Sequence, residues 1–345
     1  MSIDRILIVG LGSIGKRHLR LARQLMPHSD IRVLKHNYST DIAEYSNGSL
    51  SNLSEAIFFK PDIAVIASPA PCHIAIGHSL AKGGVHLLIE KPLSDSLLGV
   101  AELLKTCKEQ GIVIATGYNL RHLESLQYFR SALLTRVIGK VLSVRCEIGQ
   151  YLPSWRPDSD YRETVSSKRC LGGGVLLELS HELDYLRWIF GEVEWVQASL
   201  SKQSNLDIDV EDSAHITIAF QGGDQNYRLI GSVNLDFIRH DTTRMCVAIG
   251  EKGSLRWDGL SGAVSWCGEN SREWLDIFCQ KSQRDDTYLA EWRDFIECIA
   301  TSKKPLVSGE DGLKVLEIIE AVRNSAESGK RIFLDMTLAG RGGKS

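Results

Sequence analysis

The most constraining feature of this chain is a glycine-rich turn that directly follows its first apolar run. Residues 3–9 contain that run, and it is followed by Gly10-Leu11-Gly12-Ser13-Ile14-Gly15. Apolar residues then recur at the helical spacing of Leu19, Ala22 and Leu25. In such a strand–turn–helix unit, the first glycine permits the tight turn, the second lets backbone approach a pyrophosphate, and the third allows close helix packing. Because the helix N-terminus also offers free N–H donors, these six turn residues are predicted to bind a dinucleotide.

Strand and helix patterns alternate through the first third of the chain. Short apolar runs, typical of buried parallel strands, recur at residues 31–34, 62–68, 85–90 and 112–118. The helical pattern before the last of these runs is expected to have Ser94 or Asp95 as its N-cap. The alternation predicts an α/β fold with a doubly wound parallel sheet, a Rossmann domain that spans residues 1–122.

The pattern changes after residue 122. Long alternating runs joined by turns rich in Gly and Asp indicate a large open, mainly antiparallel sheet, and residues 172–191 are expected to form one helix. Two final helices, at 287–300 and 311–329, are expected to pack back toward the first domain. Glu310 and Asp311 would act as acids at the start of the last helix. Residues 123–345 are therefore predicted to form an α+β domain for substrate binding and oligomerisation.

Composition and charge exclude several classes of protein. The formal net charge is −3 and the isoelectric point is near 6.4, whereas nucleic-acid-binding domains usually carry a basic stripe. No run of about 18 apolar residues predicts a membrane span, and the N-terminus lacks the features of a secretory signal. The eight cysteines show no metal-ligand spacing and are expected to be reduced thiols. These features predict a cytoplasmic protein without a metal, a membrane or a nucleic-acid partner.

The position that selects the dinucleotide departs from the NAD pattern. An acidic residue about 20 positions after the glycine turn usually binds the ribose hydroxyls of NAD, but the second strand here ends in Lys35. A lysine there suits the 2′-phosphate of NADP, whereas a lysine that points to solvent would leave the choice open. The sequence therefore favours NADP over NAD.

Further motifs occur in the order found in a known family. They are GLGSIGKRH (10–18), SPAPCH (68–73), GGVHLLIEKPLS (83–94), GYNLRH (117–122), GGGVLLELSHELD (172–184) and SGEDGLKVLEIIEAVRNSAESGK (308–330). Together they resemble the glucose–fructose oxidoreductase / inositol dehydrogenase (Gfo/Idh/MocA) family of NAD(P)-dependent sugar oxidoreductases. The resemblance covers nearly the whole chain. It implies hydride transfer between C4 of a nicotinamide and a carbinol or carbonyl carbon of a sugar-like substrate.

The resemblance places candidate catalytic residues in two of these motifs. Lys91 corresponds to the family's lysine in Glu-Lys-Pro, which would approach the reacting oxygen and relay charge. His181 corresponds to the family's histidine and is a candidate proton carrier, since an imidazole titrates near neutrality. Asp184, three residues later, is expected on the same helical face, where it would orient the ring or contact substrate. The resemblance also implies cofactor contacts by Ser68, Pro69, His73, Glu90 and Lys91.

One position departs from the family's catalytic pattern. Members similar to inositol dehydrogenase carry an aspartate four residues before the histidine, where this chain has Leu177. The nearest acidic residue is Glu178, three residues before the histidine. Either Glu178 replaces the aspartate as a third catalytic residue, or it is an ordinary helix carboxylate and the catalytic set is incomplete.

Candidates for substrate binding lie in two loops. Asn119 and Arg121 follow the strand that would border the cleft, and Arg156, Tyr161 and Arg162 precede the GGG motif. An aromatic face with arginine forks suits a polyhydroxylated or anionic substrate through stacking and bidentate hydrogen bonds. The other interpretation of this second loop is ordinary packing.

The sequence thus predicts an NAD(P)-dependent oxidoreductase that acts on a CH–OH group of a sugar or sugar derivative. Its motifs look like those of members associated with surface-polysaccharide or nonulosonic-acid sugars. Two alternatives stay open: a lyase or hydrolase that uses tightly bound NAD+ transiently, and a non-catalytic nucleotide-sensing regulator. The open sheet predicts a homo-oligomer, a dimer or a tetramer, since an exposed apolar sheet face is otherwise a liability.

Overall fold

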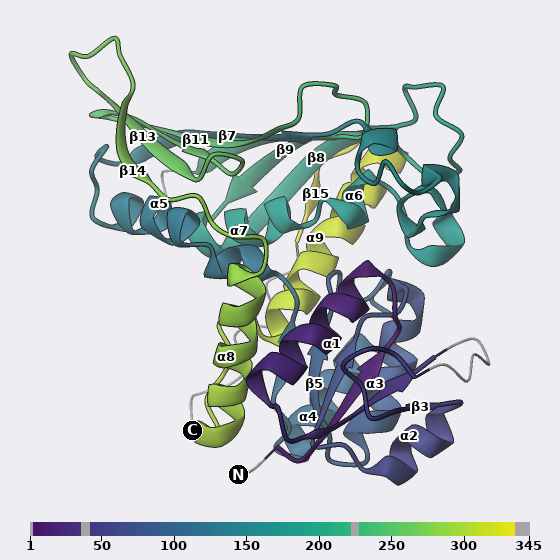
Figure 1. The fold of residues 1–345 in the computed structure, drawn as a ribbon. Coiled ribbons are helices and arrows are strands. Elements are labelled where there is room, and N and C mark those ends of the chain that lie inside the picture. Colours follow the sequence, from purple (N-terminus) through teal and green to yellow (C-terminus); the bar gives the residue numbers. More distant parts are fainter. Residues whose placement is uncertain (1–2, 36–41, 222–227, 335–345) are drawn as a thin grey trace, which may run out of the picture. The chain divides into compact units, whose positions relative to one another are not determined.

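The computed structural model of the chain describes residues 3–35, 42–221 and 228–334. The chain divides into two compact units, and each is described by itself below. The first unit comprises Met1–His122 and Arg284–Leu316, and the second comprises Leu123–Gln283 and Glu317–Ser345. Figure 1 shows that both units combine a sheet with helices.

The first unit is built on a six-stranded sheet with the order β3-β2-β1-β4-β5-β6. Its strands are β1 (Arg5–Val9), β2 (Asp30–Leu34), β3 (Gly48–Leu50), β4 (Ile63–Ile66), β5 (His86–Ile89) and β6 (Ile114–Thr116). All neighbouring strands are parallel, so their carboxyl ends meet at one edge. The strand order reverses between β1 and β4, which is the point where open α/β sheets bind ligands.

Helices supply the apolar cover that this sheet needs. They are α1 (Ser13–Leu25), α2 (Leu53–Phe59), α3 (His73–Ala81), α4 (Val100–Glu109) and α8 (Asp286–Thr301), with the short 3-10 turns η1 (Ala70–Cys72) and η2 (Asn119–His122). The apolar core around Ile6 and Ile8 of β1 includes Trp292 and Phe295 of α8, and all four residues are fully buried. A helix from the end of the chain therefore completes the core of the first unit.

Helix α4 begins later than its sequence indicates. Ser94 and Asp95 were the expected N-cap candidates, but the helix begins at Val100 and its N-cap residue is Gly99. Gly99 has φ of 75°, a left-handed conformation that favours glycine. The expected caps are wrong because the chain turns once more before it becomes helical.

The second unit contains a nine-stranded sheet with the order β14-β13-β12-β11-β7-β10-β9-β8-β15. Its strands are β7 (Val141–Gly149), β8 (Val193–Ser201), β9 (Ser213–Phe220), β10 (Leu229–Asp236), β11 (Thr243–Gly250), β12 (Gly253–Asp258), β13 (Ala263–Gly268), β14 (Leu275–Cys279) and β15 (Ile332–Phe333). Only the β7–β10 pair is parallel among these described strands. The predicted fold class, a parallel Rossmann sheet followed by a large, mainly antiparallel sheet, is confirmed.

One face of this second sheet is covered by helices (Figure 1). They are α5 (Glu124–Leu134), α6 (Val175–Glu178) and α7 (His181–Phe190), while η3 (Leu152–Ser154), η4 (Tyr161–Glu163), η5 (Val165–Ser167) and η6 (Arg169–Leu171) form the loop before α6. Alternate strand residues such as Cys146, Val233 and Trp257 are buried on that face. The Trp257 indole donates to Ser125 of α5 at 3.0 Å, which satisfies a polar atom inside the core.

The segment expected to form one helix over residues 172–191 forms two. Helix α6 ends at Glu178, and α7 begins at His181. Leu179, between them, has φ of −100° and ψ of 25°, and the Ser180 hydroxyl donates to the Leu177 carbonyl at 2.8 Å. The continuous helix was wrong because the backbone leaves the helical conformation at Leu179, and the Ser180 hydroxyl then satisfies a carbonyl of the preceding turn.

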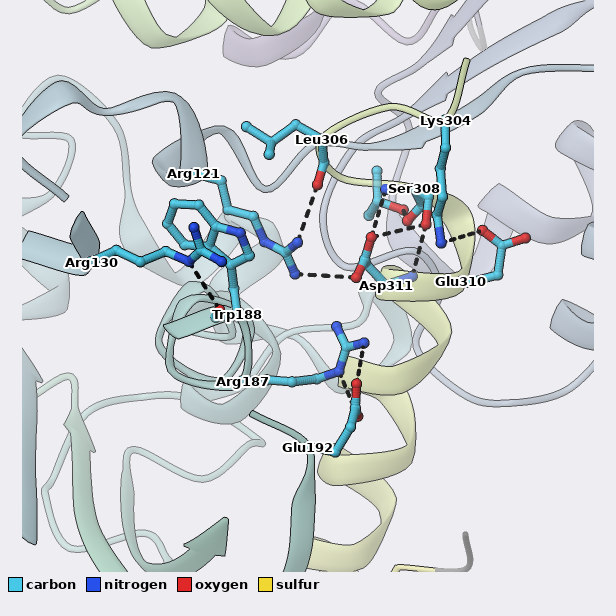
Figure 2. Close-up of polar contacts among 11 residues, drawn as sticks. Arg121, Arg130, Arg187, Trp188, Glu192, Lys304, Leu306, Ser308, Glu310 and Asp311 are labelled. Atoms are coloured by element: carbon cyan, nitrogen blue, oxygen red, sulfur yellow. Dashed lines mark hydrogen bonds and ion pairs between the residues drawn. The ribbon is translucent and has the colours of Figure 1, made fainter. Parts of the chain in front are cut away.

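The last helix, α9 (Gly309–Ser328), begins with a reciprocal cap (Figure 2). The Asp311 carboxylate accepts from the main-chain N–H and the hydroxyl of Ser308, at 3.0 and 2.9 Å, and the Asp311 N–H donates back to that hydroxyl. This pairing satisfies helix donors as a capping box does, so the expected capping role of Asp311 is confirmed.

In the second unit, Arg187 of α7 pairs with Glu192, which follows that helix (Figure 2).

Every helix in the described part of the chain is too short or too polar to span a bilayer. Nor do the described residues bring together three or more His, Cys, Asp or Glu side chains in an arrangement suited to a metal ion.

Candidate functional site

The glycine turn lies at the carboxyl end of β1, where the strand order reverses, and its three glycines serve different purposes. Gly10 has φ of 88°, and a Cβ there would lie 2.8 Å from the Ala67 carbonyl oxygen. A Cβ on Gly15 would overlap the carbonyl oxygen of Gly10. A Cβ on Gly12, however, would meet nothing within 4 Å among the described residues. The fold therefore requires Gly10 and Gly15, whereas no described contact requires Gly12.

The helix after this turn has an N-terminus suited to an anion. Helix α1 starts at Ser13, directly after Leu11 and Gly12, and Ile14 lies in its first turn. No side chain caps the start of this helix, and its first turn contains no acidic residue. Its first N–H groups have no partner within the helix, and the helix dipole favours negative charge there. The six predicted turn residues are thus placed as a pyrophosphate-binding turn requires.

Lys35 follows β2, at the same edge of the sheet. Its main-chain N–H donates to Leu50 at 3.3 Å, and β2 is the direct neighbour of β1. This is the strand end at which dinucleotide folds hold the adenine ribose. The predicted choice of NADP over NAD stays a prediction.

His73 joins the ends of β4 and β5. It is only 1% exposed, and its ring nitrogens lie 2.7 Å from the Ser68 carbonyl and 3.1 Å from the Pro92 carbonyl. Burial lowers the pKa of His73, because the charged imidazolium loses its hydration. Both partners are carbonyl acceptors and a neutral imidazole has one N–H, so the ring lies between the two segments and donates to one carbonyl at a time. The Ser68 hydroxyl oxygen is buried and has no hydrogen-bond partner among the described residues.

Glu90, Lys91 and Pro92 form the turn at the end of β5, and the Lys91–Pro92 peptide bond is cis. One Glu90 carboxylate oxygen lies 2.7 Å from Nε2 of His18, and the other accepts the Lys91 main-chain N–H at 3.1 Å. The Trp292 indole donates to Nδ1 of His18 at 3.0 Å. Since Nδ1 accepts this hydrogen bond, Nε2 carries the ring hydrogen and donates to Glu90.

Burial and hydrogen bonding oppose each other at Glu90. Burial alone would raise the pKa of this carboxyl, but the hydrogen bond and charge of His18, with Lys91, lower it below its usual range. The sequence did not predict the roles of His18 and Trp292. His18 belongs to the quoted GLGSIGKRH motif, but Trp292 lies 274 residues further along the chain, and no local pattern connects the two.

Asn119 and Arg121 make contacts within the first unit. The Asn119 amide donates to the Thr287 hydroxyl at 3.0 Å. Arg121 is 2% exposed; it donates to the Leu306 carbonyl at 3.2 Å and pairs with Asp311 (Figure 2). These bonds give both residues a structural role within the first unit, and their role in substrate binding stays a prediction.

In the second unit, the GGG turn is held by a residue that the sequence did not reveal. Gly174 has φ of 106°, and a Cβ there would overlap the Glu211 carboxylate. The main chain and side chain of Glu211 accept the first two N–H groups of α6, from Val175 and Leu176, at 3.1 and 3.2 Å. Burial raises the pKa of Glu211. Nothing in the local sequence links residue 211 to this turn, because the two meet through the folding of the sheet.

The predicted catalytic residues of this unit flank the helix break. Glu178 is the last residue of α6 and His181 the first of α7. Asp184 is 1% exposed, so its predicted contact with substrate would require a change in its surroundings. Its neighbour Glu182 is fully buried and paired with Arg244 of β11 at 2.9 Å. This ion pair, absent from the sequence-based predictions, holds the start of α7 against the sheet.

The loop that carries Arg156, Tyr161 and Arg162 lines one small cavity and one wide groove within this unit. Arg156 and Tyr161 line a cavity of about 10 Å³, which is room for one water molecule. Arg162 lines a wider groove of about 530 Å³, but its guanidinium is already paired with Asp160 at 2.7 Å. The predicted substrate contacts of these three residues therefore stay predictions.

Together, the doubly wound sheet and the open glycine turn have the form of a dinucleotide-binding Rossmann domain. The profile "Oxidoreductase family, NAD-binding Rossmann fold" matches residues 5–118, and "Oxidoreductase family, C-terminal alpha/beta domain" matches residues 130–334. The chain belongs to the Gfo/Idh/MocA oxidoreductase family, as its motifs predicted.

Individual relatives are similar at low identity. Myo-inositol 2-dehydrogenase of Thermotoga maritima is 26% identical over 298 residues, 79% of this chain and 80% of that protein. Levoglucosan dehydrogenase in complex with NADH superposes with a TM-score of 0.83 at 21% identity, over 96% of this chain and 99% of the other. The WlbA dehydrogenase from Bordetella pertussis, in complex with NADH and UDP-GlcNAcA, superposes with a TM-score of 0.79 at 23% identity. The match covers 97% of this chain and 100% of the other. The two structures establish likeness of fold.

The open space at Gly12 gives a direct test of dinucleotide binding. Alanine at position 12 is compatible with its φ of −63° and meets no protein atom, but its methyl group would occupy the approach of the pyrophosphate. We expect Gly12→Ala to keep the melting temperature and to weaken NADH binding at least tenfold, about 1.4 kcal/mol, measured by nicotinamide fluorescence. Gly48→Ala is the matched control, because a Cβ there also meets nothing within 4 Å. Equal affinity in both variants would contradict the assigned site.

Proposed function

We propose that this chain transfers a hydride between a nicotinamide dinucleotide and a CH–OH or carbonyl carbon of a sugar or sugar derivative. The observation that carries the proposal is the Glu90-Lys91-Pro92 turn, which lies at the carboxyl end of β5, on the sheet edge that also holds the glycine turn. The names of the inositol and levoglucosan dehydrogenases support the class of substrate.

The first unit holds the cofactor in this proposal. The α1 N-terminus and Gly12 bind the pyrophosphate, Lys35 lies toward the adenosine ribose, and Ser68 and the Lys91 turn lie toward the nicotinamide. When bound, the dinucleotide accepts or donates the hydride. His73 contributes by holding the two segments that flank the nicotinamide.

The proton is assigned to Lys91 and His181. Lys91 acts on the reacting oxygen, where an ammonium stabilises developing negative charge, and His181 takes up or returns the proton. Glu178 is the proposed third residue. The second unit supplies substrate specificity through Asp184 and the loop residues Arg156, Tyr161 and Arg162, and the first unit adds Asn119. The finer proposal is a sugar of surface polysaccharides, supported by the UDP-GlcNAcA in the name of one similar structure.

Replacing Lys91 separates chemistry from cofactor binding. We expect Lys91→Met to lower kcat by a factor of about 10² to 10⁴, as loss of a general acid–base group does, and to lower NADH affinity by a smaller factor, because Lys91 is also expected to contact the cofactor. Nicotinamide absorbance would be followed with a panel of inositols, free sugars and nucleotide sugars. Lys105→Met is the control, because Lys105 is an exposed lysine of the same unit. Cofactor that copurifies with the protein but shows no net turnover would favour transient use of NAD+.

Lys35 tests the choice of dinucleotide. If its ammonium binds the 2′-phosphate, wild-type protein should prefer NADPH to NADH at least tenfold, and Lys35→Asp should reverse the preference by repelling that phosphate. Calorimetry with both cofactors on wild type, Lys35→Asp and the control Lys105→Asp measures this. Tighter binding of NADH by the wild type would overturn the NADP proposal.

The uncovered face of the nine-stranded sheet is the proposed contact between copies in a homo-oligomer. The described helices of this unit lie on its other face (Figure 1), and Ile230 of β10 is 44% exposed on the open side. We expect light scattering to give the mass of a dimer or tetramer at micromolar concentration, and Ile230→Lys to lower it, since a buried unpaired charge is costly. Leu98→Lys, a change at an exposed leucine of the first unit, should leave the mass unchanged. A monomeric wild type would contradict the proposal.

A further inference from the structure

A buried acid on helix α8 has no role in the mechanism proposed above. Glu291 is 3% exposed, and neither of its carboxyl oxygens has a hydrogen-bond partner among the described residues. The charged groups that act on it are Glu90 and Asp294, both negative, and together with burial they raise the pKa of Glu291 well above its usual value. A buried polar group without a partner is rare in folded proteins and calls for an explanation.

Glu90, unlike Glu291, has hydrogen-bond donors for both of its carboxylate oxygens. It accepts hydrogen bonds from His18 and from the Lys91 main chain. The titratable groups that face it come from several elements: His18 of α1, His73 of α3, Lys91 beside it, and Tyr288 and Glu291 of α8.

Two neighbouring buried carboxyls do not both ionise, because each negative charge disfavours the other. Hydrogen bonding decides which of them keeps the proton. Glu90 has two donors, one of them the imidazole of His18, whereas Glu291 has none among the described residues. The proton therefore resides on Glu291, which also avoids the large cost of burying an unpaired charge.

We propose that Glu291 is a positioning residue that stays protonated, so that Glu90 remains ionised and bound to His18 and to the Lys91 main chain. This inference rests on the proposed role of Lys91. If Glu291 ionised, its charge would repel the Glu90 carboxylate and loosen the turn that carries the Lys91 side chain. The neutral acid thus serves Lys91 without touching substrate or cofactor.

Infrared spectroscopy of the full chain tests the protonation directly. We expect the C=O stretch of a protonated carboxylic acid at neutral pH in wild type, and its loss in Glu291→Gln. Glu297→Gln, on an exposed glutamate of the same helix, should keep the band. Glu90→Gln should move its titration to lower pH, because the neighbouring charge is removed. A wild type without this band, or a band that survives in Glu291→Gln, would overturn the proposal.

The pH dependence of unfolding is a second test that needs no substrate. A raised pKa in the folded state means that the stabilisation is complete below the unfolded pKa, about 4.5, and is lost as pH rises toward the folded value. The unfolding constant of wild type, relative to Glu291→Gln, should therefore rise up to tenfold per pH unit in that interval. A ratio that does not change with pH would contradict a buried proton on Glu291.

A pH–rate profile tests the positioning role itself. With any substrate found in the panel, wild-type kcat should decline at high pH as Glu291 ionises, and the decline should move to higher pH in Glu291→Gln. A merely structural residue would alter stability without moving this profile, so identical profiles in Glu291→Gln and Glu297→Gln would refute the role. If no substrate is turned over, the proposed function has failed, while the infrared and unfolding measurements still decide the protonation of Glu291.

Discussion

The buried hydrogen bond between His18 and Glu90, 2.7 Å long, connects the elements on which the site in the first unit depends. It joins α1, the helix that follows the glycine turn, to the end of β5, and the Trp292 indole of α8 fixes the tautomer of the histidine. A charged hydrogen bond of this kind is strong only if both partners are desolvated and held in place. The core that α8 completes is therefore also what makes the Lys91 turn rigid.

The glycine turn shows how one motif divides its work between fold and ligand. Gly10 and Gly15 are required by backbone contacts that any side chain would violate, whereas a Cβ on Gly12 would meet no described atom. A structural reason therefore exists for two of the three glycines. No described contact requires the third, and the same is true of Gly48. A ligand is expected at Gly12 because of its place in the dinucleotide motif.

Features with a local cause could be predicted from the sequence, and features that depend on distant residues could not. The parallel sheet follows from apolar runs, and the Asp311 cap follows from its place at the start of a helical pattern. The break at Leu179 lies inside a continuous apolar pattern, so helical periodicity does not report it. The meeting of His18 with Trp292 and of Gly174 with Glu211 depends on chain folding, so no spacing rule would have found either.

The helix break between α6 and α7 bears on the position of Leu177, where related proteins carry an aspartate. Leu177 is 2% exposed, so a buried apolar side chain occupies the position of the family's aspartate. Glu178 ends α6 before the chain changes direction at Leu179, so helical spacing does not carry its carboxylate to the aspartate's place relative to His181. A third catalytic carboxylate at this motif would have to act from a different direction. The proposed proton transfer therefore rests on Lys91 and His181, and Glu178 would act with a geometry different from that of the family's aspartate.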